Sequence, residues 1–436
     1  MHALRTSIMA VAACALTALA ARGQAPAPDS TAHAALDEYT RSCHGVADRL
    51  WPRPVCGPLA LIDPRTRRAF ANTKTPDTGF VAESGVFTGQ WPSSLGLANT
   101  AVDWHGERWA MVRLSLPDDA FNRIALLVHE SFHRIQPSIG LESRDATSPH
   151  LEERDGRLWL RLELAALSQA LTTTGADSKR HARDGMLFRR FRYTLYPGAD
   201  TIERALEIAE GIAEYTGVRV ALDATGLGPL SAVRSIDAHQ NDPSYARSFA
   251  YATGPALGLL LDRLDPAWRT KVVTTRDVAG LLIAASGAAG ALPDRAALIE
   301  LARPYGYALL SRFEDDRATQ RAARAATYRA RLVEGPVLEF QQSGLARSFN
   351  PQTLFPLDSL GTVYPTGAFS AEWGTLSVDS VGVLVSPDYR RARVAVPAVS
   401  PADVKRLSGP GWTLELKDGW MLAPSARPGD LVVKRR

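Results

Sequence analysis

Two histidines and a glutamate in the first half of the chain have the types and spacing of a metal site. The string HESFH runs from His129 to His133 inside an apolar segment, Ile124 to Gln136, that has helical periodicity. Residues four apart project from one face of a helix, so both imidazoles can reach one zinc ion. Glu130 is turned by about 100° from His129 and can hold a water molecule instead. Zinc lowers the pKa of such a water towards ~7, and the carboxylate takes and returns its proton. The segment therefore predicts hydrolysis without a covalent intermediate.

The HExxH string also occurs by chance, in helices whose histidines only pack or cap. A structural protein with an accidental motif is therefore one alternative interpretation of the chain. The apolar character of the segment favours the metal site, because an active-site helix is buried on most sides.

A third ligand is needed, because a catalytic zinc ion takes three protein ligands and keeps one position for water. The best candidate is Glu210, in the helical string EGIAEY. Four glutamates of this segment fall on one helical face, at spacings of four, three and four: Glu203, Glu207, Glu210 and Glu214. Carboxylates are costly to bury without cations. The alternatives are a solvated acidic face, paired with arginines such as Arg204, or Glu207 in place of Glu210 as the ligand.

HExxH followed by a helical EGxAxY pattern resembles the gluzincin zinc peptidases, above all their aminopeptidase-N-like branch. In these enzymes the glutamate before the glycine is the third zinc ligand, and the resemblance assigns this role to Glu210. Gly211 gives a helix near the metal room to approach its neighbour. Glu214 is placed to accept the free N–H of a zinc-bound histidine. The resemblance also implies a zincin-like catalytic region.

A second part of the resemblance lies downstream, in the string YATG from Tyr251 to Gly254. In the aminopeptidase-N-like branch a tyrosine in a Y-x-x-G segment stabilises the tetrahedral oxyanion, and Tyr251 matches this position. Tyr245 and His239 are alternatives. An aromatic residue at the start of a helix can also serve only in packing.

The chain departs from this branch before the zinc helix. Aminopeptidases carry a G-x-M-E-N strand whose glutamate captures the free amine of the substrate, but residues 96–99 read GLAN. An exopeptidase specificity is therefore not implied. The strand can still pair with an extended peptide, since that needs only backbone groups. The resemblance covers at most the middle third of the chain.

Composition places the chain among ordinary globular proteins. Its 436 residues are too many for one core and predict two or three domains. Hydrophobic residues make up 45% and charged residues 22%, which excludes wholesale disorder and a polytopic membrane protein. The net charge of +4 is weak for this length, and no basic cluster is interleaved with aromatic residues. The charge pattern therefore predicts no nucleic-acid partner, while the resemblance to zinc peptidases implies a peptide or protein substrate.

Residues 1–25 have the pattern of a secretory signal peptide. His2 and Arg5 precede an apolar run over residues 8–20 that ends in small residues. A lipoprotein box ending at Cys14 is the alternative, but the apolar run continues past this cysteine. No later stretch is long and apolar enough to span a bilayer. We expect a periplasmic or secreted protein without stable membrane insertion after cleavage.

Two cysteines, Cys43 and Cys56, remain after removal of the signal peptide. An even pair in an oxidising compartment predicts a disulfide. Two buried free thiols are the alternative, because the intervening loop contains a tryptophan and two prolines and is expected to be stiff.

The periodicity of the chain predicts an α+β fold in three parts after the signal peptide. Residues 26–116 begin with a helix over 30–50 and continue as a β-rich layer over 57–116, with hairpin turns at 63–66 and 105–106. Residues 117–335 form a mainly helical, zinc-binding catalytic region that Asp118 caps. Its helices are expected up to residue 135 and over 158–171, 201–222, 244–264, 276–285 and 307–333. Residues 336–436 form a small β domain, with strands expected over 337–341, 376–378, 381–385, 393–396, 412–416 and 431–434.

These patterns favour an exported zinc metallopeptidase that binds one Zn²⁺. A zinc-binding but non-catalytic envelope or secreted interaction protein on a zincin-like scaffold is the alternative. The two differ in turnover, since both expect bound metal.

Overall fold

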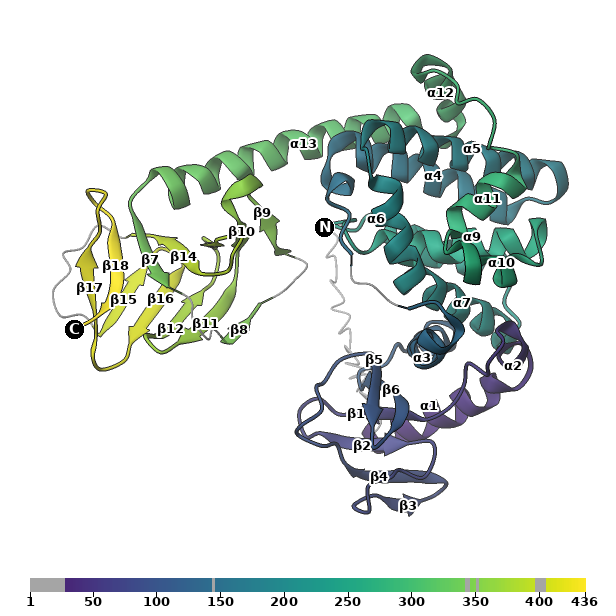
Figure 1. Ribbon diagram of the computed structural model, residues 1–436, viewed down its shortest axis with the longest axis horizontal. Coiled ribbons are helices and arrows are strands. Elements are labelled where there is room, and N and C mark those ends of the chain that lie inside the picture. Colours follow the sequence, from purple (N-terminus) through teal and green to yellow (C-terminus); the bar gives the residue numbers. More distant parts are fainter. Residues whose placement is uncertain (1–27, 143–145, 342–345, 350–352, 397–404) are drawn as a thin grey trace, which may run out of the picture.

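The computed structural model describes residues 28–142, 146–341, 346–349, 353–396 and 405–436. The predicted signal peptide and Cys14 lie outside these residues. The described residues confirm the predicted α+β class. A mainly helical middle part lies between an N-terminal sheet and a β-rich C-terminal part (Figure 1). Among the described residues, every helix is too short or too polar to span a lipid bilayer.

The N-terminal helix is interrupted, whereas the sequence predicts one helix over residues 30–50. Helix α1 (Pro28–Ser42) is followed by a kinked turn, η1 (Cys43–Ala47), and a short α2 (Asp48–Leu50). The interruption lies at His44 and Gly45, and Gly45 adopts a φ of 113°, which is readily accessible to glycine. The turn brings Cys43 to Cys56, and the predicted disulfide between them is present.

A six-stranded sheet follows, in the order β3-β4-β2-β1-β6-β5. Its strands are β1 (Leu59–Ile62), β2 (Arg68–Ala71), β3 (Val81–Glu83), β4 (Val86–Gln90), β5 (Thr100–Trp104) and β6 (Glu107–Arg113). Only β1 and β6 pair in parallel, and the two predicted hairpins are confirmed as β1–β2 and β5–β6. Both faces of β1 are buried, because Leu59 and Leu61 join the core of the helical part while Ala60 and Ile62 join a tryptophan-rich cluster. Strand β5 is one edge of the sheet.

Helix α3 (Ala120–Ile135) lies between this sheet and the rest of the helical part (Figure 1). Its cap is Asp119 and not the predicted Asp118: the Asp119 carboxylate accepts a hydrogen bond from the Asn122 backbone N–H at 2.9 Å. The helix ends where Pro137 begins the short turn η2 (Pro137–Ile139).

The helices after α3 agree in part with the prediction. The predicted ones correspond to α4 (Arg154–Thr172), α9 (Phe249–Leu264), α11 (Val278–Ser286) and α13 (Tyr307–Arg329), and the segment 201–222 corresponds to α6 (Ala199–Leu206), η4 (Glu207–Gly211) and α7 (Ile212–Thr225). Four helices have no counterpart in the sequence prediction: α5 (Gly175–Leu195), α8 (Pro229–His239), α10 (Trp268–Thr275) and α12 (Arg295–Ala302). Helix α5 lacks an apolar stripe because two of its buried residues are Arg189 and Arg192.

The C-terminal β region, residues 337–435, consists of two sheets and lies beyond the end of α13 (Figure 1). The larger sheet contains β17 (Trp420–Pro424), β18 (Leu431–Arg435), β7 (Val337–Gln341), β14 (Arg391–Ala395), β13 (Val383–Val385), β10 (Thr362–Tyr364) and β9 (Phe355–Pro356) in this order. The smaller contains β15 (Arg406–Gly409), β16 (Trp412–Leu416), β12 (Gly374–Val378), β11 (Gly367–Ala371) and β8 (Ala346–Ser348). Apolar residues of both sheets share one core, so the sheets pack face to face.

Candidate metal centre

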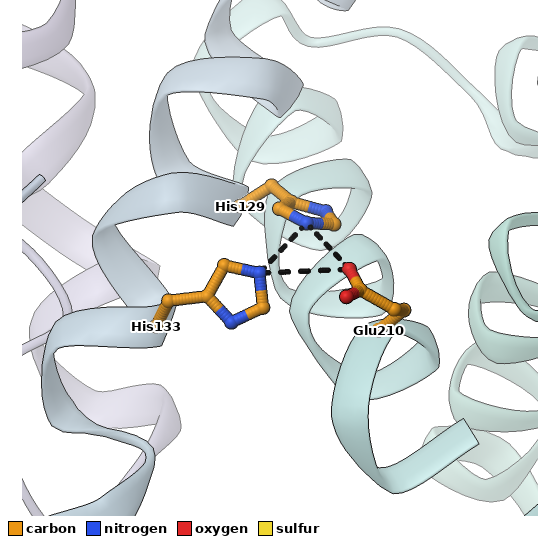
Figure 2. A group of neighbouring side chains, drawn as sticks. All are labelled: His129, His133 and Glu210. Carbon is orange, nitrogen blue, oxygen red and sulfur yellow. Dashed lines mark hydrogen bonds and ion pairs between the residues drawn. The ribbon is translucent and has the colours of Figure 1, made fainter. Parts of the chain in front are cut away.

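The two histidines of the HExxH string project from α3 towards the helix that carries Glu210 (Figure 2). The His129 Nε2 and His133 Nε2 atoms lie 3.1 Å apart. Glu210 Oε2 lies 3.4 Å from the first and 3.6 Å from the second. A tetrahedral zinc ion with bonds of ~2.1 Å separates its ligand atoms by ~3.4 Å. The three donor atoms are therefore at distances that fit one zinc ion, and the sequence prediction that these residues converge is confirmed.

A π-helical turn decides which glutamates face this site. Residues Glu207–Gly211 form a π turn between α6 and α7, where the sequence pattern predicts an unbroken helix. The inserted residue offsets the two halves, so Glu203 and Glu207 point to α5 while Glu210 and Glu214 point to α3. The four glutamates do not share one face. Glu207 is bound to Arg189 and Thr253 and lies outside the group that could hold a metal ion.

Each histidine is oriented by a partner at its other ring nitrogen. His129 Nδ1 lies 2.7 Å from Glu214 Oε2, and His133 Nδ1 lies 2.8 Å from Gln136 Oε1. These acceptors leave the Nε2 atoms to face Glu210. Glu214 therefore contacts a candidate zinc ligand, as the sequence predicts. The corresponding contact of Gln136 with His133 is not among the predictions from the sequence.

The electrostatic environment of the group favours a cation. Burial lowers the pKa of His129, but its hydrogen bonds to Glu210 and Glu214 outweigh this and raise that pKa well above the usual value. Burial raises the pKa of Glu210, and the two histidines more than reverse this, so Glu210 stays ionised. The carboxylates around His129 therefore favour a positive charge at the position of its ring.

Glu130 is buried beside this group and has an oxygen without a partner. Among the described residues, none forms a hydrogen bond with its Oε2 atom. Burial is the largest cause of a raised pKa of Glu130. A buried carboxylate oxygen with no protein partner is suited to a water molecule or a substrate group. The position and the unpaired oxygen of Glu130 are therefore consistent with a metal site that also binds water.

Tyr251 of α9 reaches the same group because two helices approach unusually closely. A Cβ atom added to Gly254 would lie 2.1 Å from the carbonyl oxygen of Gly211, so only glycine fits at this crossing. The Tyr251 hydroxyl donates a hydrogen bond of 2.9 Å to Glu210 Oε2, and its ring stacks on His129 with the ring centroids 5.7 Å apart.

The two alternatives to Tyr251 do not line the cavity that contains the metal group. The Tyr245 hydroxyl donates to the backbone carbonyl of Gln240, and the Arg157 guanidinium covers its ring. His239 is held by Asp242 at 2.9 Å. Tyr251 is therefore the candidate that can contact a ligand of the metal group.

The site opens into a polar cavity of about 570 Å³. One wall contains Asn99 and Thr100, the first residue of the edge strand β5, and another carries Arg247. This places a strand edge with backbone N–H and C=O groups next to the candidate metal ligands.

A buried network of ion pairs joins the π turn to α5. Two arginines of α5 bind three glutamates: Arg189 and Arg192 each contact Glu163, Arg189 also binds Glu207, and Arg192 also binds Glu203. Burial alone would raise the pKa of Glu203, but Arg192 and its hydrogen bonds lower it far below the usual range. The cations that a buried glutamate stripe requires thus come from α5. The solvated acidic face and a pairing with Arg204 are both wrong for Glu203 and Glu207, since Arg204 contacts Asp200 and Asp277.

No protein-family model matches this chain, and no curated protein or solved structure matches it either.

Proposed function

We propose that the protein is a zinc-dependent hydrolase that cleaves peptide bonds. The observation that carries the proposal is the group of three donor atoms, from His129, His133 and Glu210, at separations that fit tetrahedral zinc. Next to it lies Glu130, with a buried oxygen that has no partner among the described residues. Three protein ligands and a cavity on the remaining side are typical of a catalytic rather than a structural zinc site.

His129, His133 and Glu210 would hold the zinc ion, which would supply a Lewis acid for the scissile carbonyl and lower the pKa of a bound water. Glu130 takes a proton from the attacking water and returns it to the leaving amine, a role that its raised pKa favours. Tyr251 donates a hydrogen bond to the oxygen on which negative charge develops. Its hydroxyl donates to Glu210 in the structure and is therefore already directed towards the metal group.

The edge strand β5 supports an extended peptide as the substrate. Its first residue, Thr100, lines the cavity, and an edge strand offers unpaired backbone groups to a peptide that adds to the sheet. Export to the periplasm or the medium is part of the proposal. It is supported by the disulfide between Cys43 and Cys56, a bond that persists in oxidising compartments.

The test is hydrolysis of a mixed peptide library by the purified, zinc-loaded protein, analysed by mass spectrometry. Glu130→Gln keeps the shape of the site and removes the base, so we expect cleavage to fall by about 10²–10⁴-fold while zinc remains bound. Glu153→Gln, a change at the start of α4 outside the cavity, is the control. If the wild type binds zinc and leaves every peptide intact, the protein is the zinc-binding interaction protein of the alternative.

A further inference from the structure

One side chain, Gln136, contacts both helices that carry the metal group. It follows α3 directly and is buried, with 1% of its surface exposed. Its amide nitrogen donates hydrogen bonds to the backbone carbonyls of Ile208 at 2.7 Å and Ala209 at 3.0 Å. Its amide oxygen lies 2.8 Å from His133 Nδ1. Gln136 thus joins a histidine of α3 to the π turn that contains Glu210.

The two carbonyl groups determine which way the amide points. A carbonyl oxygen can only accept a hydrogen bond, so Nε2 of Gln136 must face Ile208 and Ala209. The oxygen Oε1 must then face His133, and it too can only accept. Nδ1 of His133 must therefore carry a proton, and in the neutral ring the lone pair on Nε2 then points towards His129 and Glu210.

The π turn is the segment that most needs such a partner. A π turn breaks the regular i to i−4 ladder of the helix, and buried carbonyl groups in it require other donors. Gln136 supplies two N–H groups there. A change in the position of Ile208 or Ala209 would also move Glu210, one residue further along the chain.

We propose that Gln136 is a positioning residue, which selects the metal-binding tautomer of His133 and holds that histidine in register with Glu210. The inference rests on the proposed zinc site and deepens it. Partners of metal ligands contribute about 10–100-fold to metal affinity. Gln136→Met has nearly the same volume and loses all three hydrogen bonds, so we expect its zinc affinity to fall by that factor.

The first measurement is the ¹⁵N NMR spectrum of the His133 ring in metal-free protein, at a pH where the ring is neutral. We expect the Nδ1–H tautomer in the wild type and the Nε2–H tautomer in Gln136→Met. Gln136→Glu keeps an acceptor for His133 and should retain Nδ1–H. A role limited to packing would leave the tautomer unchanged, so Nδ1–H in all three proteins overturns the proposal.

The second measurement is the zinc affinity of the same proteins, by competition with a chromophoric chelator. Gln169→Met, on α4 and outside the cavity, is the matched control and should bind zinc like the wild type. Equal affinity of Gln136→Met and the wild type would contradict the positioning role. If the wild type binds no zinc, the proposed function fails, while the tautomer experiment on metal-free protein still tests the effect of Gln136 on His133.

Discussion

The helical part and the C-terminal β region differ in what they bury. In the described part of the chain, every side chain that is both buried and polar lies between Ser42 and Glu314, and none lies in the β region. The β region buries aromatic and aliphatic residues between its two sheets. Burying charges costs free energy unless they are paired and hydrogen-bonded. The helical part carries this free-energy cost beside the candidate metal ligands. This indicates that its buried charges hold those ligands in position rather than increase the stability of the fold.

The contrast also separates two kinds of glutamate within the helical part. Glu203 and Glu207 have arginine partners and lie away from the cavity, whereas Glu130 and Glu210 line it. The paired glutamates hold the π turn in place. The cavity glutamates are available for a metal ion and a water molecule.

The largest expected effect on stability comes from breaking the buried network. Arg189→Met leaves Glu163 and Glu207 without their shared cation in a buried environment, and should cost about 3–5 kcal/mol of folding free energy. Chemical denaturation of the helical part measures this loss of folding free energy. Arg435→Met in the β region, whose partner Glu372 is exposed, is the control and should change stability by no more than about 1 kcal/mol. Equal losses in the two variants would remove the distinction between the regions.

A cavity in the β region should have a large effect that stays local. Leu414 on β16 is fully buried in the core between the two sheets, and Leu414→Ala should cost about 2–5 kcal/mol. Hydrogen exchange should accelerate in the strands of the β region, while the zinc affinity stays that of the wild type. Loss of zinc binding in this variant would show that the two regions depend on one another.

The disulfide should stabilise the N-terminal segment and the helical part on which it packs, and leave the β region unchanged. It spans a sequence separation of 13 residues, and closing a loop of about that size contributes about 3 kcal/mol. The loop places Trp51 against Phe132 of the HExxH string, with its Nε1 atom donating to Thr216 of α7 at 3.0 Å. Urea denaturation of the Cys43→Ser and Cys56→Ser double variant should show this loss. Unchanged stability, or faster exchange in the β region, would contradict it.

The smallest expected effect is at the cap of the metal-binding helix. Asp119→Ala removes the acceptor for the Asn122 N–H and should cost about 1 kcal/mol at neutral pH. This hydrogen bond is the largest cause of the lowered pKa of Asp119. The carboxylate therefore contributes fully above its unfolded value of 3.8, and the contribution is lost as the pH falls through the lower native pKa. Denaturation of both proteins at a series of pH values from 7 downwards should show the difference shrink once the pH falls below the unfolded value of 3.8.

Local patterns predicted much of this molecule because they describe a single element. The HExxH spacing needs only one helix to bring His129 and His133 together, and the strand β7 was predicted with its observed ends. The disulfide likewise joins cysteines that are near in sequence.

What could not be predicted depends on contacts between elements. The π turn replaces a regular helical turn, and no periodicity in the sequence reports one inserted residue. Arg189 and Arg192 make the sequence of α5 look polar, because the glutamates that pair with them lie outside this helix. Gln136 looks like an ordinary helix end until the carbonyls of Ile208 and Ala209 are placed beside it.

The central claim is that His129, His133 and Glu210 form one zinc site. The most direct test is calorimetric titration of the metal-free protein with Zn²⁺, together with elemental analysis after dialysis. The account predicts one bound ion per chain, and an affinity that falls by orders of magnitude in His133→Ala and Glu210→Ala. A wild-type protein that binds no zinc, or a Glu210→Ala variant that binds it as tightly as the wild type, would contradict the claim.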